Sequence, residues 1–194
     1  MHIYPSKNYS SVHSDALEHV IAPYQVNAIR RRDDWLHKGM RKSLHLLLLA
    51  HENGLPCALV LRSVAGFGFF EGVIDPGESD EEAIKKILLR HLMKHSASDR
   101  LEFSISDCLL QLWRPEFDQY LHPLLPPHVS RPKEQLRFIL VGLPPRAVFQ
   151  LPHDVALDAI PLADIARHGP FGPALTALPD LLSRTTLKLL SPQH

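Results

Sequence analysis

Residues 72–95 constrain the fold more than any other part of the sequence. A loop-like segment, Gly-Val-Ile-Asp-Pro-Gly-Glu, occupies positions 72–78. Ser79 and Glu82 follow it as a Ser-x-x-Glu capping box, which is typical of a helix start. Apolar residues at positions 84, 87, 88 and 92 then repeat at helical spacing. We therefore expect an amphipathic helix over residues 79–95 with one buried face.

The rest of the chain predicts strands before this helix and mixed elements after it, which is typical of an α/β sandwich. Residues 1–27 lack periodicity and are expected to form an extended arm, so that an arm and helix (1–38) pack on a main domain (39–194). Thirteen of the 17 prolines lie between Pro115 and Pro192, which favours short elements in the second half. We expect helices at 28–38, 161–167 and 172–183, strands at 44–50, 57–61, 107–113, 136–142 and 146–150, a hairpin turn at Asn53-Gly54, a loop at 64–68 and a strand from Phe69.

The charge balance excludes one class of function. The chain has 194 residues, with 21 Lys and Arg against 21 Asp and Glu. A protein that grips duplex nucleic acid through many phosphates usually has a basic excess. Any nucleic acid bound here should therefore be short, single-stranded and read locally. Residues 27–42 carry a local charge of +4 (six basic minus two acidic residues), which fits a solvated helix face or an RNA-backbone patch equally well.

Other sequence features predict little further chemistry. Cys57 and Cys108 lie in apolar contexts and are expected to be reduced thiols in strands. The start of the chain lacks the pattern of a secretory signal. The longest aliphatic run is residues 46–50, far too short to span a bilayer, so we expect no membrane contact and a reducing compartment. His91 and His95 have the spacing of two zinc ligands, but no third ligand is visible, so we expect no metal and no cofactor.

Residues 72–78 match the beginning of the Nudix box, in which Gly, five residues and Glu lead into a helix carrying Arg-Glu-apolar-x-Glu-Glu. Carboxylates one turn apart on that helix hold Mg²⁺ against a pyrophosphate and activate water. Here Lys86 stands at the Arg position, Ile87 replaces the first Glu, and Arg90 and His91 replace the final pair. The loop and helix are kept without the metal-binding carboxylates, so we expect no hydrolysis and no catalytic residues.

Further motifs along the chain resemble a known family, the small Nudix-fold subunit of cleavage factor Im, the pre-mRNA 3′-end processing factor. Trp-Arg-Pro and Pro-Lys-Glu at their present spacing are the most specific of them. The resemblance covers nearly the whole chain. Its motifs are Ile3-Tyr4-Pro5, Asn8-Tyr9, Gly39-Met40-Arg41, His51-Glu52, Leu55-Pro56, Phe69-Phe70, Pro76-Gly77-Glu78, Trp113-Arg114-Pro115 with Phe117, Pro132-Lys133-Glu134, Gly172-Pro173, Leu178-Pro179 and Leu181-Leu182-Ser183-Arg184.

The resemblance implies an α/β/α Nudix sandwich with a mixed sheet, an N-terminal arm and helix, and short C-terminal helices. It also implies a nuclear homodimer that binds short UGUA-type single-stranded RNA without hydrolysing it and recruits a larger subunit through that subunit's RNA-recognition domain. Phe69 and Phe70 fit a stacking platform, worth about 1–3 kcal/mol per base. In an alternating strand one ring should point inward and the other toward the RNA. The alternative is that either phenylalanine is simply a core residue of the strand.

Several positions depart from the family. Its base-reading residues, two Glu and one Arg, correspond to His45, His19 and Asn27 here. Histidine can donate and accept, whereas a carboxylate only accepts, so base contacts either survive in altered form or lose specificity. Arg30, with its two arginine neighbours, lies near the missing Arg and is a candidate substitute. Phe171 replaces a family Tyr, which keeps stacking and removes a hydroxyl.

The partner-binding positions have changed as well. His122 and Leu124 stand where the family has two Tyr for the larger subunit, and Leu181 is a third candidate contact. Three hypotheses remain open. The first is a non-catalytic RNA-binding subunit, the second is a dimeric interaction scaffold that has lost RNA specificity, and the third is a Nudix hydrolase with displaced metal ligands.

Overall fold

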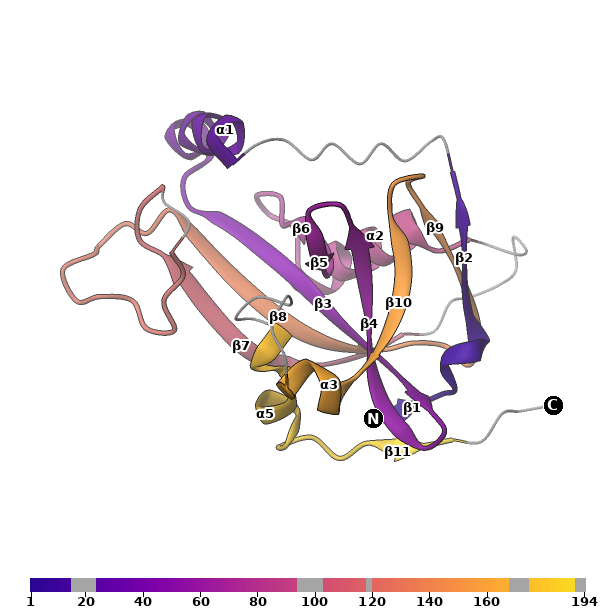
Figure 1. Ribbon diagram of the computed structural model, residues 1–194. Helices are drawn as coiled ribbons and strands as arrows, with labels where there is room; N and C mark the ends of the chain where they lie inside the picture. Colours follow the sequence, from indigo (N-terminus) through magenta and orange to yellow (C-terminus); the bar gives the residue numbers. More distant parts are fainter. Residues whose placement is uncertain (15–23, 94–102, 118–119, 168–174, 191–194) are drawn as a thin grey trace.

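The computed structural model describes residues 1–14, 24–93, 103–117, 120–167 and 175–190 (Figure 1). A mixed sheet forms its centre, with strand order β10-β4-β3-β8-β7. Strands β3 and β8 run parallel, and the other neighbours on this path are antiparallel. Short β5 pairs with β4, and β6 pairs with β3. The strands are β3 (Arg41–Glu52), β4 (Leu55–Ser63), β5 (Gly66–Gly68), β6 (Phe70–Val73), β7 (Ser104–Arg114), β8 (Glu134–Gly142) and β10 (Ala156–Pro161).

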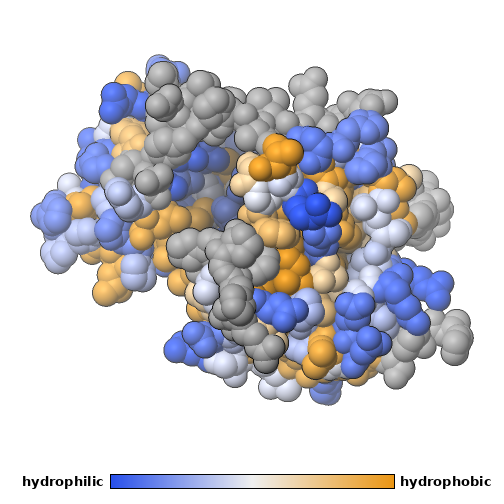
Figure 2. All heavy atoms as spheres, in the orientation of Figure 1, coloured by the Kyte–Doolittle hydropathy of each residue, from blue (hydrophilic) through white to orange (hydrophobic). Residues whose placement is uncertain are grey.

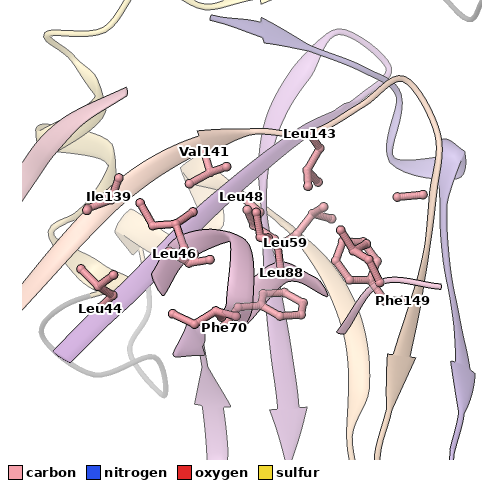
Figure 3. Close-up of a cluster of buried hydrophobic side chains, with 14 of the residues drawn as sticks. Leu44, Leu46, Leu48, Leu59, Phe70, Leu88, Ile139, Val141, Leu143 and Phe149 are labelled. Carbon is pink, nitrogen blue, oxygen red and sulfur yellow. The ribbon is translucent and has the colours of Figure 1, made fainter. Parts of the chain in front are cut away.

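Helices cover both faces of this sheet, which confirms the α/β/α sandwich. Helix α2 (Asp80–His91) packs on one face, and α3 (Leu162–Arg167) and α5 (Leu178–Leu182) pack on the other (Figure 1). The two faces carry separate hydrophobic clusters, because alternate side chains of each strand point to opposite sides. Figure 3 shows the cluster beneath α2, where Leu88 meets Leu46 and Leu48 of β3 and Phe70 of β6.

The first thirteen residues are paired strands rather than the extended arm expected from the sequence. Strand β1 (His2–Ile3) runs parallel to β11 (Lys188–Leu189), and β2 (Tyr9–His13) runs parallel to β9 (Ala147–Leu151). A short 3-10 helix, η1 (Ser6–Asn8), joins β1 to β2. The Met1 ammonium donates to the Thr186 carbonyl at 2.7 Å. Both of these strand pairs therefore join the start of the chain to its second half.

Helix α1 (Tyr24–Lys38) begins four residues earlier than predicted and ends at Gly39, whose φ of +78° suits a glycine after a helix. No helix among the described residues has both the length and the apolar content that crossing a membrane requires. Figure 1 shows α1 at one end of the molecule, next to the connection between β7 and β8.

Local signals in the sequence are confirmed where turn or cap chemistry is specific. The Ser79 hydroxyl accepts from the Glu82 amide, and the Glu82 carboxylate accepts from the Ser79 amide, completing the capping box. Asn53 and Gly54 both have positive φ, 50° and 82°, as a type I′ turn needs. Three expectations are wrong in detail. Helix α2 ends at His91, residues 66–68 are a strand, and β10 was not foreseen.

Candidate nucleic-acid interface

In the region of the Nudix box, the Lys86 ammonium group lies between two carboxylates. Lys86 Nζ lies 2.8 Å from both Asp75 Oδ2 and Glu78 Oε2. These hydrogen bonds raise the pKa of Lys86, and Lys86 lowers the pKa of Asp75. Ile87 is buried, and a Cβ on Gly72 would lie only 2.5 Å from its Cγ1. The helix position that would carry the first metal-binding carboxylate therefore packs into the core instead.

His91, at the last Glu position of the box, is also turned inward. Its ring lies 5.3 Å from that of Phe70. Burial lowers the pKa of His91, and it outweighs a hydrogen bond to the Gln150 backbone, which would raise that pKa. Arg90 beside it is exposed. In the described part of the chain, no three His, Cys, Asp or Glu side chains gather as metal ligands would. His95, the second residue of the possible zinc pair, lies outside the described residues.

A cleft of about 460 Å³ lies between the second half of α1 and the adjacent ends of β3 and β6; we call it the α1 cleft. Side chains of both signs line it, and Figure 2 shows hydrophilic surface between α1 and the central strands. Lys38 and Asp34 form an ion pair at 3.2 Å. The lining residues are Arg31, Asp34, Lys38, Gly39, Met40, Arg41, Lys42, Glu71, Val73, Ile74, Asp75 and Pro76.

His45 and Glu71 form a polar pair next to this cleft. The two residues are opposite each other in the β3–β6 register, and His45 Nε2 lies 3.2 Å from Glu71 Oε2. The His45 ring packs between Phe138 and Phe69, with centroid distances of 5.0 and 5.8 Å. Burial lowers the pKa of His45, more than Glu71 raises it, so its imidazole is neutral near pH 7. Glu71, by contrast, is 67% exposed and presents an acceptor to the cleft.

Phe69 and Phe70 point to opposite faces of the sheet, as alternation predicts. The expectation that one of them is exposed is wrong. Phe70 is fully buried in the cluster beneath α2, so in this conformation it cannot stack on a base. Phe69 is 8% exposed, because its ring packs edge-on against Phe138 at 5.5 Å. Of the pair, only Phe69 lies on the same face as His45.

A buried carboxylate fixes the edge of the α1 cleft. Glu134, 5% exposed, accepts from the Ser43 hydroxyl at 2.6 Å and from Arg114 Nε at 2.8 Å, and Arg41 Nε lies 3.2 Å from it. Burial alone would raise the pKa of Glu134, but the hydrogen bonds from Ser43 and Arg114 and the two arginine charges outweigh it, and the pKa is lowered. The carboxylate is therefore ionised and holds Arg41 at the cleft wall.

The structure describes only part of the predicted RNA-contact set. His19 and Phe171 lie outside the described residues, as do the side chains of Asn27 and Arg30 on α1. Four of the six basic residues in the 27–42 segment line the α1 cleft: Arg31, Lys38, Arg41 and Lys42. The basic segment is thus one wall of a cleft.

The predicted partner contacts lie on two elements. His122 and Leu124 are in the β7–β8 connection, where the His122 backbone exchanges two hydrogen bonds with Trp113, at 2.7 and 2.8 Å. Leu124 is 80% exposed. Leu181 is half-buried on α5, which packs beneath the sheet face that carries Leu112 and Leu136.

Sequence reasoning missed two features of this region. Glu71 carries no local motif, and only its register with His45 places it at the cleft. Arg114 and Glu134 were noted in Trp-Arg-Pro and Pro-Lys-Glu, but their contact depends on the β7–β8 register, in which they are opposite each other. The one signal for this contact in the sequence was that Arg114 and Glu134 each lie in a motif next to a predicted strand.

The fold and the loop–helix segment together define a Nudix protein. A family model, NUDIX_2, described as "Nucleotide hydrolase", matches residues 1–185, and the chain belongs to this family. Within it, the chain is 28% identical to pre-mRNA cleavage factor Im 25 kDa subunit 2 of Arabidopsis thaliana over 190 residues, 97% of this chain and 95% of that protein. It is also 28% identical to cleavage and polyadenylation specificity factor subunit 5 of Dictyostelium discoideum over 165 residues, 84% and 82% of the two chains. These relatives confirm the resemblance seen in the motifs.

Among solved structures, the NUDIX domain of Shewanella oneidensis NrtR, complexed with ADP ribose, matches with a TM-score of 0.49 at 14% identity. The match covers 78% of this chain and 96% of that one. The Ap4A hydrolase of C. elegans matches with a TM-score of 0.45 at 16% identity, over 74% and 96% of the two chains.

Proposed function

We propose that this protein is a non-catalytic, RNA-binding subunit of the nuclear machinery for mRNA 3′-end cleavage and polyadenylation. The names of its near-full-length relatives support a role in mRNA 3′-end processing. The observation that carries the non-catalytic part is the buried Ile87, in place of the first metal-binding carboxylate, followed by Arg90 and His91 in place of the final pair. Mg²⁺ needs hard oxygen ligands, which none of these three side chains supplies.

The α1 cleft supports binding of a short single strand. Its basic residues suit phosphates, while Glu71 offers an acceptor for base edges and His45 lies behind it at 3.2 Å. Binding of this kind relies on a few local contacts, which agrees with a net charge of zero. We propose UGUA-like RNA as the ligand, with homodimerisation and recruitment of a larger subunit carrying an RNA-recognition domain, through His122, Leu124 and Leu181, as the accompanying interactions.

One observation favours the second candidate, an interaction scaffold without sequence-specific RNA binding. Tyr120 and Leu124 of the β7–β8 connection are 63% and 80% exposed, and Leu36 on α1 is 69% exposed. Large exposed apolar side chains in neighbouring elements are typical of protein contacts. A scaffold would keep these side chains in use while the α1 cleft lost its base contacts.

Fluorescence anisotropy separates the two candidates. A labelled hexanucleotide containing UGUA should bind more tightly than a scrambled one; equal or absent binding would leave the scaffold as the function. Glu71→Gln removes a charge from an exposed side chain and should reduce the preference for UGUA without unfolding the protein. Glu81→Gln on α2, equally exposed and paired with Lys85, is the matched control and should change nothing.

A hydrolase assay tests the non-catalytic proposal independently. Dinucleotide polyphosphates incubated with the protein and Mg²⁺ should release no phosphate. Mg²⁺-dependent release that survives purification to constant specific activity would establish the third hypothesis, a hydrolase with displaced ligands.

A further inference from the structure

A second pocket adjoins the α1 cleft; we call it the tryptophan pocket. It has a volume of about 710 Å³ and lies between the end of α1 and the β7–β8 connection. Trp35 reaches it from α1 and Trp113 from the end of β7, and both rings are half-buried. The described residues that line it are Trp35, Leu36, Gly39, Met40, Trp113, Leu125, Ser130, Arg131 and Pro132.

Cations and aromatic rings are interleaved at this pocket. Lys133 Nζ lies 3.8 Å from the centroid of Trp35, and Arg131 Cζ lies 5.8 Å from it, both within the range of cation–π attraction. Arg131 lines the pocket, and none of the described lining residues is acidic. Phe117 meets the Trp35 ring edge-on at 6.0 Å, and Trp35 is nevertheless half-exposed and lines the pocket. Aromatic faces beside basic side chains are the chemistry that holds unpaired nucleotides.

The tryptophan pocket is continuous with the α1 cleft. Gly39 and Met40, which connect α1 to β3, line both. A strand leaving the α1 cleft along this connection enters the tryptophan pocket next. We propose that the tryptophan pocket binds a nucleobase that flanks the RNA segment held in the α1 cleft, by stacking on the indoles with its phosphate near Arg131. This inference rests on the proposed RNA-binding function.

The chain provides its own reporter for a test. It has two tryptophans, and both line this pocket, so intrinsic tryptophan emission monitors the pocket alone. Five RNAs of three kinds are compared: UGUA alone, UGUA with three uridines added at the 5′ or the 3′ end, and UGUA with three abasic nucleotides added at the 5′ or the 3′ end. The abasic extension keeps the phosphates and removes the bases. Affinity is measured by anisotropy, and the emission is read at saturation.

We expect one uridine extension to bind at least about fivefold more tightly than UGUA and to quench tryptophan emission, because stacking of one base contributes at least that much. The abasic extension should leave the emission unchanged and should keep only the smaller part of the affinity gain, which its phosphates make with Arg131. Arg131→Ala should reduce the gain, whereas Arg146→Ala, an exposed arginine beyond the far end of β8, should not.

The outcomes separate this proposal from the one on which it rests. Unchanged emission with the bound uridine extensions, or equal gains from abasic and uridine extensions, would overturn the base-stacking role while UGUA binding still stood. A Trp35→Leu variant that keeps both its UGUA affinity and the full extension gain would also overturn it. If UGUA and its extensions all fail to bind, the proposed function itself fails.

Discussion

Replacement of Glu134 by glutamine tests whether the buried charge network supports the fold as its geometry implies. Glutamine keeps the shape of the side chain, but it removes the negative charge between Arg41 and Arg114. The two carboxylate oxygens of Glu134 now accept from Ser43 and Arg114. In glutamine one of these oxygens becomes an NH₂ group, which is a donor and would face the donor of Ser43 or Arg114. The change therefore removes the negative charge that pairs with a nearly buried arginine.

The expected cost follows from the exposure of each partner. Removal of one partner from a buried ion pair costs about 3–5 kcal/mol. The Arg114 side chain is 10% exposed, which supports the lower end of that range, and Arg41 at 36% exposed adds little because solvent screens it. We expect the free energy of unfolding to fall by about 3 kcal/mol, which for a chain of this size lowers Tm by roughly 6–12 °C.

The effect should depend on pH with a definite sign. The pKa of Glu134 in the folded protein is below its ordinary value of 4.5. The ionised carboxylate therefore stabilises the fold fully at pH values above about 4.5, and this stabilisation is lost as pH falls through the lowered folded value. The stability gap between wild type and Glu134→Gln should be constant from pH 6 to 8 and should narrow below about pH 4.5.

Urea denaturation followed by circular dichroism measures both quantities. Glu71→Gln is the control, because Glu71 is exposed and its loss should cost less than about 0.5 kcal/mol. A cost below about 1 kcal/mol for Glu134→Gln, or a gap that widens in acid, would show that the network does not stabilise the fold in this way.

Three further predictions concern packing, capping and charge. Gly72→Ala should lower the free energy of unfolding, measured in urea, by about 1–3 kcal/mol, because the added Cβ would meet Ile87 at 2.5 Å. Gly68→Ala is the control and should not destabilise the fold, because its Cβ would meet nothing within 4 Å. In a double-mutant cycle, Ile87→Ala should relieve the clash that Gly72→Ala creates. Ser79→Ala should cost about 1 kcal/mol by thermal melting through loss of the α2 cap, and no loss would contradict the capping-box geometry. RNA affinity should fall only shallowly as salt is raised from 50 to 200 mM in anisotropy titrations, because few phosphates are neutralised; a steep slope would contradict local binding.

Sequence reasoning succeeded where a local pattern has one physical solution. Ser79 with Glu82 and Asn53 with Gly54 have few alternatives, and both formed as predicted. Strand β10 was missed because its residues are all half-exposed and include Asp158 and Pro161, so no alternation signals a strand. Its place is set by pairing with β4, which a single sequence does not encode locally.

The candidate site was harder to predict because its contacts join distant segments. The alternation of Phe69 and Phe70 was predicted correctly, but their burial depends on Phe138, which belongs to a strand some 70 residues later. His45 was placed by counting along a motif, whereas its partner Glu71 follows only from the β3–β6 register. The sequence thus predicted which single residues belong to the site region, but it did not predict which of them contact each other.

The pairing of β1 with β11 and of β2 with β9 has a consequence for synthesis of the chain. Residues 2–13 are synthesised before their partners, which lie at 147–151 and 188–189. At about 5–20 residues per second, β1 waits roughly 10–40 s before β11 exists. During that interval β1 has no partner strand, while the strands of the central sheet are already being made. The β1–β11 pair can therefore form only after residues 188–189 have been released, so that among the described strands the first to be made is one of the last to be paired.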